Sequence, residues 1–202
     1  IDGGHTGVET AYATLVENRG SLSGYAFSVR AFDALTVIRN SGEMRGDIGV
    51  GALGSISSIV NTGEIVGDIR LGEQGAQAFV TNSGLIVGDV RLGDILPDAF
   101  DGRGGSVVGT VYGGGGADTL TGAAAEDVFS GGDGADSLTG SAGDDILEGG
   151  GGADRIRGGR GADVFVYAAV ADSKSGAMDV IRGWDADDQF DLSAIDASRS
   201  GG

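Results

Sequence analysis

The sequence predicts an all-β chain wound as a parallel solenoid. Residues 113–166 hold six consecutive nine-residue units, and the residues before 113 repeat with a period of 21. The chain has 202 residues, of which 42 are glycine and one is proline. Repeats of fixed length stack each coil on its neighbours, so regular periods indicate a solenoid. At fixed places in a repeat, the glycines mark turns and do not indicate a flexible chain.

Each nine-residue unit has an aspartate at its sixth place and a large apolar residue at its eighth. The units read GGGGADTLT, GAAAEDVFS, GGDGADSLT, GSAGDDILE, GGGGADRIR and GGRGADVFV. Their aspartates are Asp118, Asp127, Asp136, Asp145, Asp154 and Asp163. The last three residues predict a very short strand whose middle side chain, the apolar one, points inward. One apolar residue per nine is buried only when units stack.

The glycine-rich turn and its aspartate also predict a metal. Such turns aim carbonyl oxygens inward, and the aspartate adds a carboxylate. Hard oxygen ligands without histidine or cysteine suit Ca²⁺ and fit zinc or copper poorly.

The units resemble the RTX (haemolysin-type) calcium-binding repeat G-G-x-G-x-D-x-U-x. The resemblance implies a parallel β-roll with 18-residue coils, in which a Ca²⁺ ion lies between a unit and the second unit after it. It implies four sites, at the aspartate pairs 118/136, 136/154, 127/145 and 145/163. It also implies carbonyl ligands from the first and third places of one unit and the second and fourth places of the next unit on that side. In the order of the sites, these are Gly113, Gly115, Gly132 and Gly134; Gly131, Asp133, Gly150 and Gly152; Gly122, Ala124, Ser141 and Gly143; Gly140, Ala142, Gly159 and Gly161.

Alanines weaken one of these sites. Residues 123–125 are all alanine where glycines would help the turn, so the 127/145 site is expected to be the weakest.

The upstream repeat predicts a right-handed parallel β-helix. Asn40-Ser41-Gly42, Asn61-Thr62-Gly63 and Asn82-Ser83-Gly84 are spaced by 21 residues, about one β-helix rung. Alternation over residues 65–71 predicts a half-buried strand. The asparagines are expected to stack as an amide ladder. Asp47, Asp68 and Asp89 are expected to form an acidic row beside Arg70 and Arg91, with a carbohydrate- or cation-binding groove as the alternative interpretation.

The rest of each upstream rung reads as a decayed nine-residue unit, so the two repeats form one solenoid. Gly93, Asp98 and Phe100 take the first, sixth and eighth places of one such unit, which adds a fifth, poorer calcium site at 98/118. In the unit before it, Phe79 takes the eighth place and Gln77 replaces the aspartate.

The chain therefore divides into β-helix rungs at 1–112, the β-roll at 113–166 and a capping segment at 167–202. The cap resembles the tail that closes RTX rolls, and it is expected to cover the last coil with Trp184, Phe190 and Leu192. Whether Asp185, Asp187 or Asp188 binds a further ion, or forms a solvated acidic loop, stays open. The segment also could carry part of a type I export signal.

Charge and composition restrict the partners. The formal net charge of −17 argues against nucleic acid and anionic membranes. Residues 113–166 hold ten acids and three arginines, so folding there is expected to need a divalent cation. Cysteine is absent, and no apolar run is long enough to span a membrane. The resemblance implies export by a type I secretion apparatus to the exterior or the cell surface.

No catalytic set is apparent. The single histidine, His5, lies near a terminus, and the usual nucleophile and zinc motifs are absent. We expect a secreted calcium-binding β-roll, not an enzyme, that supports export and stability of a larger exoprotein. The alternatives are a segment of a self-associating extracellular assembly (an adhesin, surface layer or fibre) and a module acting on extracellular polysaccharide.

Overall fold

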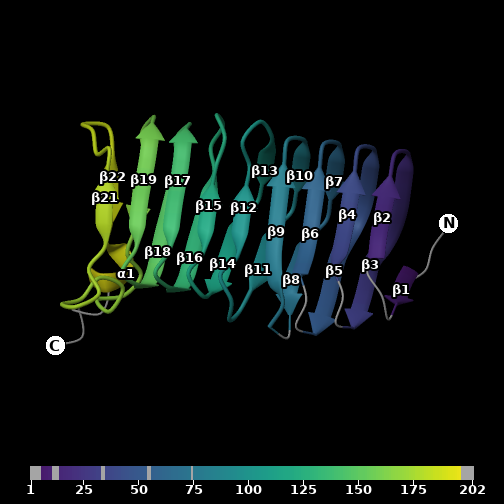
Figure 1. The fold of residues 1–202 in the computed structure, drawn as a ribbon. Helices are drawn as coiled ribbons and strands as arrows, with labels where there is room; N and C mark the ends of the chain where they lie inside the picture. Colours follow the sequence, from purple (N-terminus) through teal and green to yellow (C-terminus); the bar gives the residue numbers. More distant parts are fainter. Residues whose placement is uncertain (1–5, 11–13, 33–34, 54–55, 74, 197–202) are drawn as a thin grey trace.

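The fold is a parallel β-solenoid whose coils stack along one axis (Figure 1). It is a computed structural model, and it describes residues 6–10, 14–32, 35–53, 56–73 and 75–196. Strands of successive coils pair in parallel, and the described residues contain one short helix, α1 (Ser193–Asp196). The predicted fold class is confirmed. None of the described helices is long and apolar enough to cross a membrane. His5 lies outside the described residues.

One side of the solenoid is a nine-stranded sheet. In spatial order its strands are β2 (Thr14–Asn18), β4 (Thr36–Asn40), β6 (Ile56–Asn61), β9 (Gln77–Asn82), β12 (Ala99–Asp101), β15 (Thr119–Thr121), β17 (Ser137–Ala142), β19 (Arg155–Arg160) and β21 (Val180–Arg182).

The other side is a thirteen-stranded sheet that divides at β5, which pairs with both β7 and β8. Its strands are β1 (Thr6–Thr10), β3 (Ser21–Phe32), β5 (Glu43–Leu53), β7 (Glu64–Val66), β8 (Ile69–Glu73), β10 (Leu85–Val87), β11 (Val90–Gly93), β13 (Ser106–Val108), β14 (Val111–Gly115), β16 (Val128–Gly134), β18 (Ile146–Gly152), β20 (Val164–Val166) and β22 (Gln189–Asp191).

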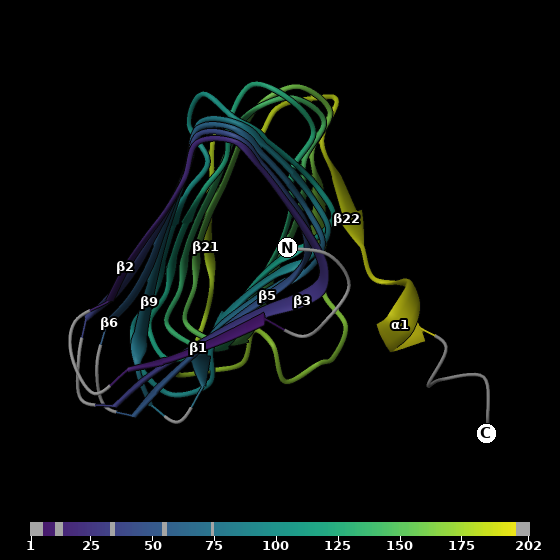
Figure 2. The same ribbon diagram turned by 90° about the vertical axis from the view of Figure 1, so that its right-hand side faces the viewer.

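Upstream coils have three sides, because a corner divides the strand predicted over 65–71 (Figure 2). Ile65 and Ile69 point into the core on either side of the corner, as alternation predicted. Between them Gly67 has φ +144°, and a Cβ there would lie 2.5 Å from the carbonyl oxygen of Gly46 in the coil before. A side chain at the corner would therefore push adjacent coils apart.

Coils become shorter along the chain without a break in strand pairing, as predicted. The N–H of Thr110 donates to Asp89, 21 residues earlier, whereas the N–H of Asp118 donates to Asp136, 18 residues later. Across this change β14 pairs with β11 on one side and with β16 on the other. The eighth-place residues then form two buried rows in one core, with Phe100, Leu120, Leu138 and Ile156 on the nine-stranded sheet and Phe129, Leu147 and Phe165 on the thirteen-stranded sheet.

The alignment predicted for the decayed unit before Asp98 is wrong by one residue. Phe100 pairs with Val80, which is 1% exposed, while Phe79 is 37% exposed. The backbone N–H of Ala78 donates a hydrogen bond to Oδ1 of Asp98. Ala78, and not Gln77, therefore takes the place of the aspartate in this unit. Asp98 lies 20 residues after Ala78, so this coil is shorter by one than the period on which the alignment rested.

Part of the C-terminal segment packs against the last coil. Residues 167–177 form a loop with one isolated bridge between Lys174 and Ala177. Trp184 stacks on Phe190 at 4.7 Å between ring centroids, and both rings lie 5.8 Å from Phe165. Leu192 remains half-exposed beside this cluster.

Candidate metal centre

The sixth-place aspartates form two columns, one at each edge of the coils. Asp98, Asp118, Asp136 and Asp154 lie in turns that lead into the nine-stranded sheet, and Asp127, Asp145 and Asp163 lie in turns that lead out of it. Within each column, the backbone N–H of one aspartate donates to Oδ1 of the aspartate one coil later, at 2.8 to 3.0 Å. The structure thus brings together the pairs 98/118, 118/136, 136/154, 127/145 and 145/163.

The second carboxylate oxygen, Oδ2, is buried without a hydrogen-bond donor in most of these aspartates. The affected residues, each at most 3% exposed, are Asp98, Asp118, Asp136, Asp145, Asp154 and Asp163. Leaving a charged oxygen buried and unpaired is costly, and such a group shifts its pKa toward the neutral form. Burial raises the pKa of Asp136 to about 7. A bound cation would supply the missing partner.

Burial raises the other carboxyl pKa values as well. The pKa is raised to about 6 in Asp98, Asp145 and Asp154. In Asp136 and Asp145, repulsion from the neighbouring aspartates of the same column adds to the effect of burial. The columns are therefore short of positive charge.

Turn carbonyls face the same gaps between coils. A Cβ added at Gly132 would clash with the carbonyl oxygen of Gly114, and one at Gly134 would clash with that of Gly116. Carbonyls at the second and fourth places of the earlier unit thus point toward the later coil. The carbonyl of Asp133, at the third place of the later unit, points back and accepts the N–H of Gly116 at 2.9 Å.

The direction of these carbonyls differs from the expected one. The expected ligands were the carbonyls at the first and third places of the earlier unit and at the second and fourth places of the later unit. The carbonyl of Gly131 faces back toward Gly113, and that of Arg160 accepts the N–H of Gly143 at 2.9 Å, so the same polarity holds on both edges. Successive carbonyls of a parallel strand point to opposite neighbours, and the register decides which neighbour each one meets.

Each gap therefore offers two carboxylates and several carbonyl oxygens. Among the described residues, no three histidine, cysteine, aspartate or glutamate side chains converge on one point as a metal site. Backbone oxygens would have to complete the coordination. Such all-oxygen sets with six to eight ligands suit Ca²⁺, so the donor set and the unpartnered Oδ2 atoms fit this ion.

Comparison with protein families agrees with this geometry. The family model of the RTX calcium-binding nonapeptide repeat (4 copies) matches residues 103–138 and 130–165. Residues 103–165 are RTX calcium-binding repeats. The comparisons with curated proteins and with solved structures find no match.

The RTX repeats thus identify a calcium-binding β-roll module within the solenoid. RTX repeats on a β-solenoid are typically structural, calcium-binding elements.

The RTX unit at 122–130 departs from its neighbours in the way its alanines suggested. Asp127 Oδ2 accepts the N–H of Ala123 at 2.8 Å, so this oxygen already has a donor. The hydroxyl of Ser141, which has a positive φ of 92°, donates to the carbonyl of Gly122 at 3.2 Å. Polar groups of the 127/145 gap are partly satisfied by protein atoms, which supports its expected weakness.

The structure adds two aspartates to the columns of the RTX repeats. The N–H of Asp154 donates to Asp179 Oδ1 at 3.0 Å, and the N–H of Asp163 donates to Asp188 Oδ1 at 3.1 Å. Asp188 was among the three tail acids considered from the sequence, but Asp179 was not. Neither Asp185 nor Asp187 takes a column position, and both are exposed.

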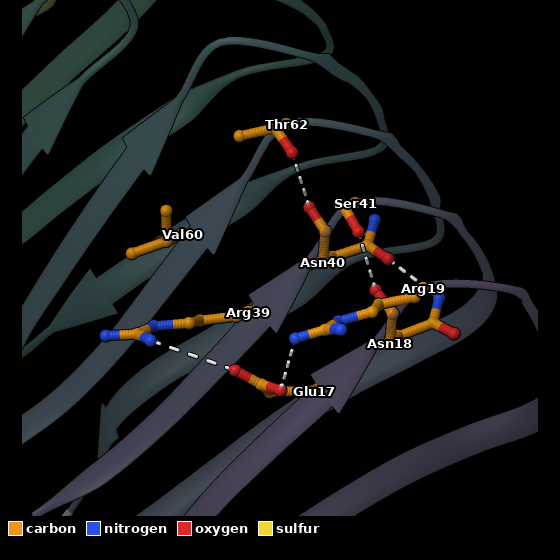
Figure 3. Close-up of a pocket in the computed structure, with 8 residues that line it drawn as sticks. All are labelled: Glu17, Asn18, Arg19, Arg39, Asn40, Ser41, Val60 and Thr62. Carbon is orange, nitrogen blue, oxygen red and sulfur yellow. Dashed lines mark hydrogen bonds and ion pairs between the residues drawn. The ribbon is translucent and has the colours of Figure 1, made fainter.

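Upstream of the RTX repeats, a separate column of buried amides links the coils. Asn40, Asn61 and Asn82 form the predicted ladder, and Asn18 extends it by one coil; the Nδ2 of Asn18, Asn40 and Asn61 each donates to the next Oδ1 at 2.7 to 2.8 Å. Arg39 and Arg19 pair with Glu17 in a hollow beside this ladder (Figure 3).

The predicted acidic and basic rows also lie side by side. Arg70 and Arg91 each pair with two of Asp47, Asp68 and Asp89. Arg91 also stacks on Tyr112, with its guanidinium carbon 4.7 Å from the ring centroid. Within the described residues, the acids of this face therefore pair with arginines, unlike those of the RTX columns.

Proposed function

We propose that this chain is a secreted calcium-binding module that folds on binding extracellular Ca²⁺ and supports the export and stability of a larger exoprotein. The observation that carries the proposal is the row of buried Oδ2 atoms without donors. A carboxylate has no proton to donate, so stacked carboxylates cannot satisfy one another. A cation in each gap removes this penalty, which makes ion binding part of folding.

Four ions are assigned to the gaps 118/136, 136/154, 127/145 and 145/163, and a fifth to 98/118. In the first gap the carboxylates of Asp118 and Asp136 would bind with carbonyls turned toward the gap. The geometry favours those of Gly114 and Gly116 from the earlier coil, with Gly131 and Asp133 from the later one. Asp98 Oδ2 is buried without a donor like its neighbours, which supports the fifth site.

Export gives these sites a physical purpose. Extracellular calcium modules typically bind with Kd values of about 10⁻⁴ to 10⁻³ M. Such sites stay empty where calcium is scarce and fill outside the cell. A chain held open by its own negative charge would pass through a type I secretion apparatus and fold on exit. In this proposal the module has no catalytic activity.

A calcium titration followed by far-UV circular dichroism tests the proposal. With chelator the RTX region should have little β-structure, and Ca²⁺ in the micromolar to millimolar range should restore it cooperatively. Magnesium at the same concentrations is the control, because it prefers near-octahedral sites that keep several waters. Spectra that do not change with Ca²⁺ would disprove the proposal.

A second candidate is a segment of a calcium-dependent extracellular assembly. The cap exposes several apolar side chains at one end of the solenoid, among them Val170, Met178, Trp184 and Phe190. Exposed apolar patches often mark interaction surfaces. Light scattering during the same titration separates the candidates, because an assembly grows on calcium addition while an isolated module stays monomeric.

A further inference from the structure

The two aspartate columns continue into the C-terminal segment. The N–H groups of Asp154 and Asp163 each donate to an aspartate 25 residues later, whereas column bonds within the roll span 18 residues. Strands β21 and β22 pair in parallel with the last regular coil at these positions. The difference in length matches the segment 167–173. Once this insertion is removed, the segment contains two more nine-residue units in register.

These units are KSGAMDVIR at 174–182 and GWDADDQFD at 183–191. Asp179 and Asp188 take the sixth places, and Ile181 and Phe190 take the eighth. Ile181 pairs with Ile156, and Phe190 pairs with Phe165, so the eighth-place residues stay in register; Ile181 is partly buried, and Phe190 is 49% exposed. The first unit has Lys174 at the place of the first glycine, which hides the repeat in the sequence.

Unpartnered oxygens of the last regular coil face these two units. In regular coils Oδ2 of the earlier aspartate lies in the gap toward the later coil. For example, a Cβ on Gly113 would meet both Asp118 Oδ2 and the carbonyl of Gly131 at 2.5 Å. By the same geometry, Oδ2 of Asp154 and of Asp163 face the gaps to Asp179 and Asp188. Both residues are fully buried, and neither Oδ2 has a hydrogen-bond donor.

The surroundings of the two gaps are acidic. The charges of Asp179 and Asp172 act on Asp154, and those of Asp188, Asp185 and Asp144 act on Asp163. No ion pair of the described residues involves any of these acids. Asp179 Oδ2 is also buried without a donor, whereas Asp188 Oδ2 accepts the N–H of Asp185 at 2.8 Å.

We propose that the calcium array extends into the cap, with one ion between Asp154 and Asp179 and a second between Asp163 and Asp188. The inference rests on the proposed calcium binding of the roll and adds two sites to it. These ions would stabilise the pairing of β21 and β22 with the last regular coil. Because Trp184 stacks on Phe190 of β22, calcium binding in the cap also orders the aromatic cluster. Calcium thus controls closure of the solenoid end as well as folding of its coils.

Two variants and a matched control test the two sites in the full chain. Asp179→Asn and Asp188→Asn keep the Oδ1 acceptor and remove the charge. Asp187→Asn makes the same chemical change at an exposed tail position outside the columns. Bound Ca²⁺ is counted by equilibrium dialysis. The fluorescence of Trp184, the single tryptophan of the chain, reports the cap.

Each column variant should bind about one Ca²⁺ fewer than the wild type. The Trp184 signal should need about ten-fold more Ca²⁺, because ligand charge sets the affinity of such sites. Asp187→Asn should match the wild type in both measurements. Column variants that bind as many ions as the wild type would overturn the inference. Should Asp179→Asn fail to fold in Ca²⁺ by circular dichroism, the count for Asp188→Asn decides. A wild type that binds no Ca²⁺ would instead remove the proposed function itself.

Discussion

Replacing Asp136 with asparagine should have opposite effects on stability with and without calcium. Asp136 is fully buried and borders two gaps, 118/136 and 136/154. Its Oδ1 accepts the N–H of Asp118 at 2.8 Å, and asparagine keeps this acceptor. The substitution therefore removes the negative charge with little change in shape.

The magnitudes follow from linkage. A site at a Ca²⁺ concentration 100-fold above its Kd stabilises the fold by about 2.7 kcal/mol. Loss of both sites would cost about 5 kcal/mol in calcium. In chelator, burial raises the pKa of Asp136 from 3.8 to about 7. At about 1.4 kcal/mol per pKa unit, ionised Asp136 destabilises the metal-free coil by about 4 kcal/mol, and the variant relieves most of this.

Urea unfolding in excess Ca²⁺ and far-UV circular dichroism in chelator measure the two effects. Asp127→Asn is the matched control, because Asp127 borders one gap and its Oδ2 already accepts the N–H of Ala123. This control should lose less stability in calcium and gain little in chelator. The reasoning fails if Asp136→Asn destabilises the fold equally in both conditions, since only a structural role would then remain.

Three further predictions concern pH, the turns and the amide ladder. Burial raises the pKa of Asp136 to about 7 and that of Asp145 to about 6, so their contribution to metal-free stability is complete below the unfolded value near 4 and is lost as pH rises through 6 to 7. Circular dichroism in chelator should therefore show more β-structure at pH 5 than at pH 8. In a calcium titration, the Ca²⁺ concentration at the midpoint should rise on acidification. A chelator spectrum that does not change with pH would contradict this. Gly134 has φ +149° and lies against the carbonyl of Gly116, so Gly134→Ala should lower the free energy of unfolding in urea by about 3 kcal/mol. A Cβ at Gly151 would contact only the side chain of Asp133, so Gly151→Ala should cost clearly less. Equal costs would refute the close approach of the coils at Gly134. Asn61→Ala leaves ladder partners on both sides unpaired and should cost about 2–4 kcal/mol, the same with and without calcium; a calcium-dependent loss would count against the separation of the two halves.

The sequence predicted the parts of the fold that depend on a fixed period. The nine-residue offset, together with the 18-residue coil that the RTX resemblance implies, placed Asp118 beside Asp136 and Asp127 beside Asp145. The asparagine ladder followed from its 21-residue spacing in the same way.

The errors arose where the period changes. Phe79 was assigned to the core because the alignment assumed the regular upstream period, whereas the shorter coil there pairs Phe100 with Val80. The column positions of Asp179 and Asp188 were missed because residues 167–173 interrupt the register. The direction of the turn carbonyls depends on strand register alone, since every residue type has the same carbonyl. The corner at Gly67 is likewise a backbone property that the alternation of apolar residues around it does not reveal.

The two halves of the solenoid satisfy buried polar groups between coils by different chemistry. An asparagine side chain carries both a donor and an acceptor, so a column of asparagines is complete in itself. An ionised aspartate carries acceptors only, so a column of aspartates requires positive charge from elsewhere. The change occurs near Asp98, where the first buried Oδ2 without a donor appears. Upstream coils can therefore stay folded in chelator. Their last strands, β11 and β12, then present an ordered sheet edge with which the calcium-dependent coils pair one after another. In a quasi-one-dimensional array each new coil needs only its neighbour, so the calcium-independent half can act as the template for the half that needs the ion.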